Sequence, residues 1–381
     1  MINLLHGDCL EQMKTLEDNS VDSIVSDPPY GISFMAKKWD YDVPSVEVWE
    51  EAMRVLKPGG HALIACGTRT QHRMVVNIED AGFEIRDVVS WIYGSGFPKS
   101  LNISKAIDKA AGAERKVVGH KPPCGMFSPD TPHFGSASEV EDTYQSSPIT
   151  TPATEAAKQW DGWGTALKPS CEFFTLCRKP LSEKTIAANV LKWGTGGINI
   201  DACRVGTTGS RTNSNGKRSM YGGNSLLESK THNDTTTIHN TGRFPANLIH
   251  DGSQEVLELF PETKTNKGTA RKKGDSKSMF GNVLLDGHVC SQGDQGSAAR
   301  FFYCAKASKK DRDEGNNHPT VKPTALMQYL CRLITPAGGV VLDPYMGSGS
   351  TGKAAVREGF SFVGCELDDD YYEIAKARVG S

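Results

Sequence analysis

The stretch VVLDPYMGSGSTGK, residues 340–353, decides the fold of this chain. It continues an apolar run, Gly339–Asp343, that predicts a strand, and it leads into Ser350–Glu358, whose spacing predicts a helix. Glycine lets a backbone turn tightly and lets a ligand approach it closely. The turn and the start of the helix contain three glycines: Gly347, Gly349 and Gly352. A strand, a glycine turn and a helix in this order are typical of an α/β fold with parallel strands.

The glycine pattern admits several ligands. With Glu366 about 20 residues further on, it fits a dinucleotide, whose ribose hydroxyls are bound by an acid at the end of the next strand. The segment from Gly347 to Lys353 nearly matches a phosphate-binding P-loop, but Ala354 stands where that loop needs Ser or Thr to hold magnesium. A nucleotide triphosphatase is therefore disfavoured. A nucleoside cofactor such as S-adenosylmethionine, or a plain glycine turn without a ligand, remains open.

Strands and helices alternate at both ends of the chain. Ile2–His6 and Val21–Ser26 are apolar runs separated by the helical spacing of Cys9–Leu16, and Ser361–Glu366 and Asp369–Arg378 predict a final strand and helix. The other predicted elements are a strand at His61–Cys66, a helix at Thr68–Asp80, and strands at Phe83–Tyr93 and Glu172–Arg178. Such alternation indicates a parallel sheet built from βαβ units.

The middle of the chain has a different composition. Residues 121–155 contain six prolines and ten Ser or Thr, which predicts a long loop. Residues 206–242 contain 24 Gly, Ser, Thr or Asn, which again predicts a loop. We therefore expect one α/β domain divided between the two ends, with an irregular polar region inserted between its halves.

Composition excludes several classes of protein. The 381 residues include 43 basic and 45 acidic ones, and no apolar stretch approaches the roughly 18 residues that span a bilayer. The N-terminal segment shows no secretory signal. The ten cysteines are scattered without a CxxC pair, which argues against a disulfide framework and a zinc ribbon. These features predict a cytoplasmic protein that has no metal site and does not interact with a membrane.

A second motif follows the apolar run Val21–Ser26: Asp27, Pro28, Pro29 and Tyr30. Two prolines stiffen a turn and remove backbone donors, so Asp27 and the nearby carbonyls can only accept hydrogen bonds. Such a group suits an exocyclic amine, and the flat ring of Tyr30 suits a base removed from a duplex. The alternative interpretation is an ordinary turn at the end of a strand.

With these two motifs, the chain resembles the amino-group DNA methyltransferases, which methylate adenine N6 or cytosine N4 with S-adenosylmethionine. DPPY near the N-terminus and the glycine motif near the C-terminus resemble the beta class, whose Rossmann-like fold is circularly permuted. The resemblance covers roughly residues 1–110, 165–180 and 300–381. It implies an α/β fold with a mostly parallel seven-stranded sheet, helices on both faces and an inserted target-recognition region.

The resemblance also implies roles for residues outside DPPY. Gly7-Asp8-Cys9-Leu10 resembles the motif for the cofactor's adenine, and NHPTVKP, residues 317–323, resembles the element that lines its methionine end. Tyr345 stands where the family often has Phe. The implied cofactor-binding residues are Asp8, Cys9, Asp27, His318, Lys322, Asp343, Tyr345, Gly347, Ser348, Gly349 and Glu366.

The activity implied is transfer of a methyl group to adenine N6 in double-stranded DNA, with Asp27, Pro28, Pro29 and Tyr30 as the catalytic motif. The alternatives are cytosine N4 methylation, an RNA substrate, or a non-catalytic nucleic-acid-binding module with a vestigial cofactor fold. Relatives that act on cytosine more often carry Ser at the first motif position, so Asp27 favours adenine. The resemblance leaves open a homodimer and a cognate restriction endonuclease.

Basic residues are in excess in the middle of the chain, whereas the remainder is acidic. Phosphate contacts require such groups, so this region is the expected DNA reader. Its clusters are Lys217 and Arg218, Arg271, Lys272 and Lys273, and Lys309 and Lys310. The expected division is a catalytic half at 1–120, a polar loop at 121–165, the last sheet strand at 166–180, a target-recognition domain at 181–313 and a cofactor-binding half at 314–381.

Overall fold

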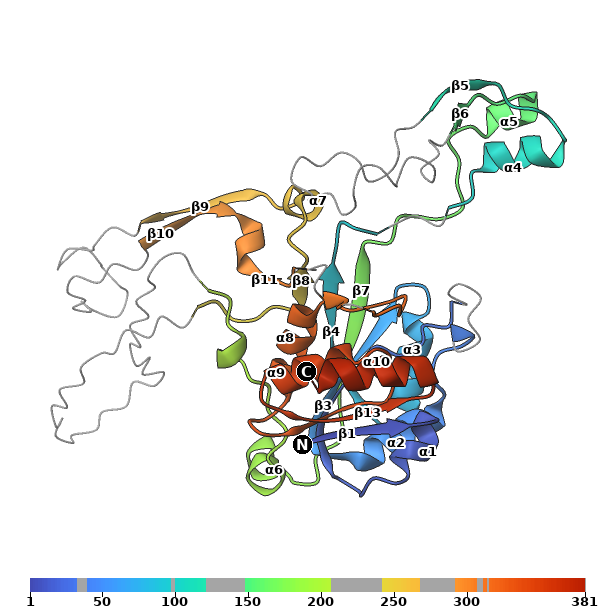
Figure 1. The fold of residues 1–381 in the computed structure, drawn as a ribbon. Coiled ribbons are helices and arrows are strands. Elements are labelled where there is room, and N and C mark those ends of the chain that lie inside the picture. The colour runs from blue at the N-terminus through green and yellow to red at the C-terminus, as the bar shows by residue number, and fades with distance from the viewer. Residues whose placement is uncertain are drawn as a thin grey trace, which may run out of the picture. The chain divides into compact units, whose positions relative to one another are not determined.

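The computed structural model describes residues 1–32, 40–96, 100–120, 148–206, 242–267, 292–306, 311–313 and 315–380. By their internal contacts the residues fall into two compact units (Figure 1). The first unit combines Met1–Gly94 with Ser170–Ser381, and the second comprises Ser95–Pro169. Among the described residues, no helix is both long and apolar enough to cross a membrane.

A large, mostly parallel sheet forms the centre of the first unit. In spatial order its described strands are β1 (Ile2–His6), β13 (Ser361–Glu366), β12 (Val340–Asp343), β2 (Val21–Ser26), β3 (Leu56–Gly67), β7 (Cys171–Arg178), β4 (Glu84–Ile92), β8 (Leu248–His250) and β11 (Tyr303–Cys304). Only β7 runs antiparallel to its neighbours in this sheet. The expected α/β fold is thus confirmed, and the two ends of the chain pair within one sheet, β1 with β13 and β2 with β12.

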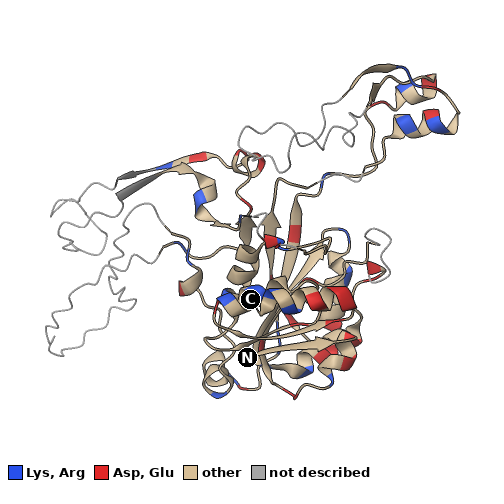
Figure 2. Ribbon diagram, viewed as in Figure 1, with Lys and Arg blue, Asp and Glu red and all other residues tan. Residues whose placement is uncertain are grey.

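Helices cover both faces of the sheet. The described helices of this unit are α1 (Cys9–Met13), α2 (Val46–Val55), α3 (Gln71–Asp80), α6 (Ile186–Trp193), α7 (Gln254–Leu257), α8 (Thr324–Ile334), α9 (Ser350–Arg357) and α10 (Asp369–Val379), with short 3-10 turns at Asp201–Cys203 and Ala298–Phe301. In α10, acidic residues begin the helix and basic residues end it (Figure 2), which matches the helix dipole.

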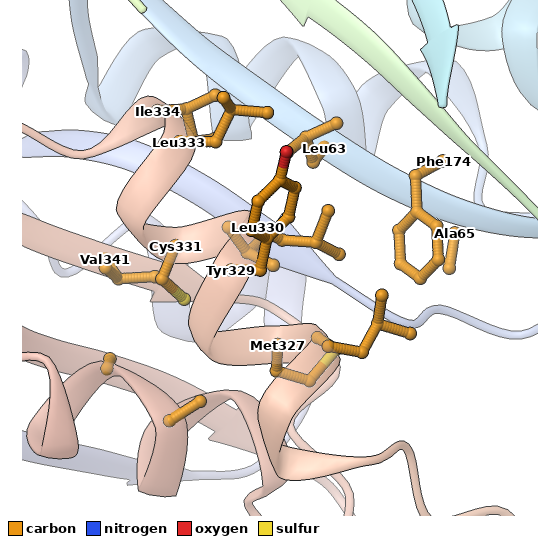
Figure 3. Packing of buried hydrophobic residues seen from close by; sticks show 14 of the residues in the cluster. Leu63, Ala65, Phe174, Met327, Tyr329, Leu330, Cys331, Leu333, Ile334 and Val341 are labelled. Carbon is orange, nitrogen blue, oxygen red and sulfur yellow. The ribbon is translucent and has the colours of Figure 1, made fainter. Parts of the chain in front are cut away.

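Alternating side chains of the central strands divide the core into two clusters. Leu63 and Ala65 of β3 join the cluster that includes α8, α9 and α10. Figure 3 shows side chains of α8 packed in this cluster with Leu63 and Phe174. Ala62 and Ile64, the intervening residues, join the cluster that includes α1, α2 and α3. Successive strand residues point to opposite faces, so this division confirms a sheet covered on both sides.

The strand directions bring the functional motifs to one edge of the sheet. The parallel strands β2, β12 and β13 end at Ser26, Asp343 and Glu366, respectively. Because β7 is antiparallel, its beginning lies at this same edge, and Glu172 is in register with Gly67, the last residue of β3. Ligands of open α/β sheets bind outside the carboxyl ends of the strands.

Two expectations about the inserted region need correction. We expected seven strands, and the described residues show nine in this sheet, because β8 and β11 extend it beyond β4. These two strands come from 181–313, so the described part of that segment belongs to the first unit and is no separate domain. This segment also supplies the hairpin of β9 (Glu262–Lys267) and β10 (Gln292–Ser297).

The separate unit lies at Ser95–Pro169 instead. It contains α4 (Ile103–Ala110), α5 (Glu155–Gln159) and the antiparallel pair β5 (Val117–His120) and β6 (Pro148–Thr150). The expected loop at 121–165 therefore ends in regular structure, while 121–147 lies outside the described residues. Asp108 joins α4 to α5, because its carboxylate accepts hydrogen bonds from Arg115 at 2.6 Å and from the Thr154 hydroxyl at 2.8 Å.

Candidate active site

Asp27 is the first residue after β2, and both of its carboxylate oxygens are hydrogen-bonded. Oδ1 accepts from the Tyr30 hydroxyl at 2.8 Å, and Oδ2 accepts from Lys322 Nζ at 2.6 Å. About a fifth of the Asp27 side chain is exposed, so a further donor has access to it. Each carboxylate oxygen has two lone pairs and can accept a second hydrogen bond.

Tyr30 is fixed by contacts on several sides. A Cβ added to Gly67 would lie 3.0 Å from the Tyr30 ring, so only glycine leaves that ring its place. The buried carboxylate of Asp40 accepts from the backbone amides of Tyr30 at 2.7 Å and of Gly31 at 2.9 Å. Sequence reasoning missed Asp40, whose hydrogen bonds to these two amides hold the backbone that follows Pro29.

Lys322 lies between two carboxylates. Its ammonium contacts Glu172 Oε2 at 3.2 Å in addition to Asp27, and it lies 5.4 Å from the centre of the Tyr30 ring. Burial lowers the pKa of Lys322, but the charges of Asp27 and Glu172 outweigh burial and raise the pKa above its usual value. Lys322 is therefore a permanent cation. The structure places Lys322 at the motif Asp27–Tyr30, called the acceptor motif below. The predicted contact of Lys322 with the cofactor's methionine end stays a prediction.

Glu172 is a second residue that sequence reasoning missed. Its Oε2 accepts from the Tyr30 hydroxyl at 3.2 Å, and its Oε1 accepts from the Tyr93 hydroxyl at 3.5 Å. Burial first, and then the charges of Asp27 and Glu172, raise the pKa of Tyr30 well above its usual value, so Tyr30 remains a donor. The sequence predicts a strand that begins at Glu172. It does not predict which strands pair with this one, and that pairing is what brings Glu172 to Tyr30.

The glycine loop, residues 343–349, begins at Asp343, which is almost fully buried. Its Oδ1 accepts from the Ser26 hydroxyl at 2.6 Å and from the Tyr345 amide at 3.1 Å. Burial raises the pKa of Asp343 to about 6, although hydrogen bonds from Ser26, Thr351 and the Tyr345 amide oppose the shift. Through Ser26, this carboxyl joins the loop to the last residue of β2, which Asp27 follows.

The glycines of the loop adopt left-handed backbone conformations. Gly347 has φ +50° and Gly349 has φ +78°. A Cβ added to Gly349, the N-cap of α9, would lie 2.8 Å from Val379 Cγ2, and one added to Gly347 would lie 3.0 Å from His318 Nε2. Both positions thus require glycine for two reasons, backbone conformation and close packing.

Ser348 and Lys353 face the interior of the protein. The Ser348 hydroxyl accepts from Arg378 at 2.8 Å and from Asn316 at 3.2 Å. Lys353 donates to Asp313 at 2.7 Å and is 8% exposed. The lysine of the P-loop interpretation is therefore engaged in a structural ion pair, which further disfavours that interpretation. The expected contact of Ser348 with the cofactor stays a prediction.

Glu366, Asp8 and Cys9 lie together where β13 ends beside β1. The Gly7 amide donates to the Glu366 carbonyl at 2.8 Å. Burial raises the pKa of Glu366. Asp8 caps α1, with Oδ1 accepting from the Leu10 amide at 3.0 Å, and the Cys9 side chain is hydrogen-bonded to Tyr345. A carboxylate at this position can accept from ribose hydroxyls.

His318 closes this edge beside the glycine loop. Its Nδ1 lies 2.9 Å from the Thr320 carbonyl oxygen. Its ring lies edge-on to the Tyr371 ring, with 4.4 Å between the two ring centres. The Asn316 carboxamide accepts from the His318 amide at 3.0 Å. The structure thus places His318 next to Gly347, while the binding role of His318 stays a prediction.

Other sequence-based expectations have separate outcomes. Trp91, within the strand expected at Phe83–Tyr93, is 8% exposed and belongs to the core cluster. The seven cationic residues expected to contact DNA lie outside the described residues: Lys217, Arg218, Arg271, Lys272, Lys273, Lys309 and Lys310.

The sheet, the glycine loop and the acceptor motif together define a Rossmann-like methyltransferase class. A model of the DNA methylase family for N6 and N4 methylation matches residues 21–377, and the chain belongs to this family. Members of the family depend on S-adenosylmethionine.

Two similar curated proteins are type II methyltransferases. M2.LlaDCHI of Lactococcus lactis subsp. cremoris is 29% identical over 108 residues, which are 28% of this chain and 39% of that protein. M.ScaI of Streptomyces caespitosus is 36% identical over 80 residues, 21% of this chain and 26% of that protein. The chain thus matches less than half the length of either relative. The solved complex of M1.HpyAVI with S-adenosylmethionine is 16% identical with a TM-score of 0.43, and all of each chain is covered.

Proposed function

We propose that this protein is an S-adenosylmethionine-dependent DNA methyltransferase that methylates the N6 amine of an adenine flipped out of the double helix. The observation that carries the proposal is the Asp27 carboxylate, held by Tyr30 and Lys322 at the sheet edge that also bears the glycine loop. Membership in the DNA methylase family supports it. This function makes double-stranded DNA the partner and the cytoplasm the expected location.

The residues of the proposed cofactor site fit S-adenosylmethionine. Glu366 is an acceptor at the end of a strand, as ribose hydroxyls require, and the backbone at Gly347 can be approached closely. Lys353 is bound to Asp313, so the described loop offers no free lysine for a phosphate. S-adenosylmethionine contains no phosphate and needs no such lysine. When bound, this cofactor supplies an electrophilic methyl group on a sulfonium.

The role of the acceptor motif follows from the chemistry of the amine. The amino nitrogen of adenine is a weak nucleophile because its lone pair is delocalised into the ring. Hydrogen bonds from its N–H groups to Asp27 and to the Pro28 carbonyl would draw the nitrogen toward tetrahedral geometry and localise that lone pair. The face of Tyr30 would hold the base in place. Catalysis then depends on positioning and on electrostatics, and the nitrogen, cationic once it carries the methyl group, would release its proton to the Asp27 carboxylate or to solvent.

Cytosine N4 is the second candidate, because the same acceptor would serve either amine. The Asp at position 27 favours adenine. Digestion of DNA methylated by the purified protein, followed by mass spectrometry of the nucleosides, separates the two: N6-methyladenine supports the proposal, and N4-methylcytosine replaces it. Absence of any methylated nucleoside, despite binding of S-adenosylmethionine and DNA, would favour a non-catalytic binding module.

The basic middle of the chain is the proposed DNA reader. Deletion of residues 206–242 is expected to weaken DNA affinity and sequence preference while leaving S-adenosylmethionine binding intact. Unchanged DNA affinity and preference after this deletion would contradict the assignment for that segment. A homodimer and a cognate restriction endonuclease stay predictions.

A further inference from the structure

Glu172 reaches the acceptor motif because of how β7 is placed in the sheet. Its register partners are Gly67 at the end of β3 and Trp91 near the end of β4. About a fifth of its side chain is exposed, so the carboxylate lies at the rim of the site. No residue near Glu172 in the sequence belongs to either family motif, so its presence at the site is a property of the sheet alone.

Apart from the Tyr93 hydroxyl, the side chain of Glu172 contacts groups that also serve the motif. One oxygen accepts from the Tyr30 hydroxyl and contacts the Lys322 ammonium, both at 3.2 Å. The Lys322 ammonium is closer to Asp27, at 2.6 Å. One buried cation is therefore shared by two carboxylates, with the shorter contact to Asp27.

A target amine has to bind Asp27 beside Lys322, whose ammonium already donates to Oδ2 at 2.6 Å. Hydrogen bonds between ions are stronger than those from a neutral donor, so an isolated pair of Asp27 and Lys322 would resist an incoming amine. A second carboxylate changes this balance because the ammonium can move toward Glu172 without losing a charged partner. Unpaired buried charges are strongly unfavourable, so Glu172 keeps Lys322 paired when the ammonium moves away from Asp27.

We propose that Glu172 is a positioning residue that shares Lys322 with Asp27 and so lets Asp27 accept the amine of the target base. The inference rests on the proposed function. Glu172 acts through Lys322 and is not proposed to contact the base or the cofactor. Its loss is expected to lower the rate of methyl transfer and to leave cofactor affinity unchanged.

The test compares Glu172→Gln with Glu172→Asp in the full-length protein. For Glu172→Gln we expect kcat for methyl transfer to DNA to fall by about 100-fold, while the Kd for S-adenosylmethionine, measured by calorimetry, stays within about twofold. Glu172→Asp keeps the charge on a shorter side chain and is expected to be about tenfold faster than Glu172→Gln. A purely structural role of the side chain would not produce this rescue by charge.

Glu84→Gln is the matched control. Glu84 pairs with Arg178 at the other end of β7, with 2.6 Å between Arg178 Nη2 and Glu84 Oε2, and it makes no described contact with the acceptor motif. We expect its kcat to stay within about twofold of the wild type. Wild-type kcat in Glu172→Gln, or equal kcat in Glu172→Gln and Glu172→Asp, would overturn the inference and leave the proposed function standing. Absence of methyl transfer by the wild-type protein would instead overturn the proposed function.

Discussion

The ammonium of Lys322 donates a 2.6 Å hydrogen bond to the carboxylate of Asp27, although 295 residues separate them in the chain. The segment that carries Lys322 precedes α8, and Asp27 follows β2. Pairing of β2 with β12 brings the two ends of the chain together. The acceptor motif is therefore complete only when the C-terminal half of the domain has folded onto the N-terminal half.

Asp27→Ala is expected to abolish methyl transfer, with a loss of about 100-fold or more, because no carboxylate remains to accept from the amine. Binding of S-adenosylmethionine is expected to remain measurable. Transfer of a labelled methyl group to DNA reports the first quantity, and calorimetry reports the second. Methylation at the wild-type rate would refute the assignment of Asp27.

Tyr30→Ala and Tyr30→Phe separate the ring of Tyr30 from its hydroxyl. Loss of the ring is expected to weaken binding of the flipped base by about 1–3 kcal/mol, whereas Phe keeps the stacking surface. The hydroxyl contacts Asp27, Glu172 and Lys322, so some loss of kcat is still expected in Tyr30→Phe. DNA affinity measured by fluorescence anisotropy tests the stacking. Equal affinities for the Ala and Phe variants would argue against it.

Gly349→Ala can be compared with Gly359→Ala, because both glycines have nearly the same φ, +78° and +82°. A Cβ at Gly349 would lie 2.8 Å from Val379, whereas no described atom lies within 4 Å of one at Gly359. Backbone strain alone is expected to lower the free energy of unfolding by about 1 kcal/mol at either position. The additional clash predicts a larger loss in Gly349→Ala, together with weaker binding of S-adenosylmethionine. Equal losses of stability, with unchanged cofactor affinity, would show that the close packing is unimportant.

Asp343→Asn tests the buried carboxyl of the cofactor loop. Burial raises the pKa of Asp343 from 3.8 to about 6, so between these values the folded protein keeps a proton that the unfolded chain releases. Raising the pH through this window favours unfolding, and the effect is complete above pH 6. The wild type is expected to lose on the order of 2–3 kcal/mol of stability relative to Asp343→Asn between pH 4 and pH 6.

The measurement is denaturant unfolding of both proteins at several pH values. Burial lowers the pKa of His61 to about 4, which acts in the opposite direction over a similar range. Both proteins retain His61, so its effect cancels in the difference between them. A difference in stability that is constant from pH 4 to pH 7 would contradict the raised pKa of Asp343.

Much of the fold follows from local patterns in the sequence. The predicted strands at Val21–Ser26 and Ser361–Glu366 have the bounds of β2 and β13. Apolar periodicity is a local property, and strong turn signals such as the loop at Gly347 mark where strands and helices end. The Pro- and Ser-rich composition of 121–155 misled the prediction at its end, where α5 forms from the strong helix formers Glu155–Gln159 behind the N-cap Thr154.

The sequence by itself determined the α/β class and the order of the two motifs, and it supplied Asp27 and Tyr30 as the proposed acceptor residues, because each element and each motif is a pattern of neighbouring residues. Only the tertiary structure decided which residues surround that acceptor. Glu172, 142 residues from Tyr30, reaches it through strand order and register, and Lys322, 295 residues from Asp27, reaches it from the segment before α8. Register depends on the packing of whole sheet faces, so no local stretch of sequence encodes it.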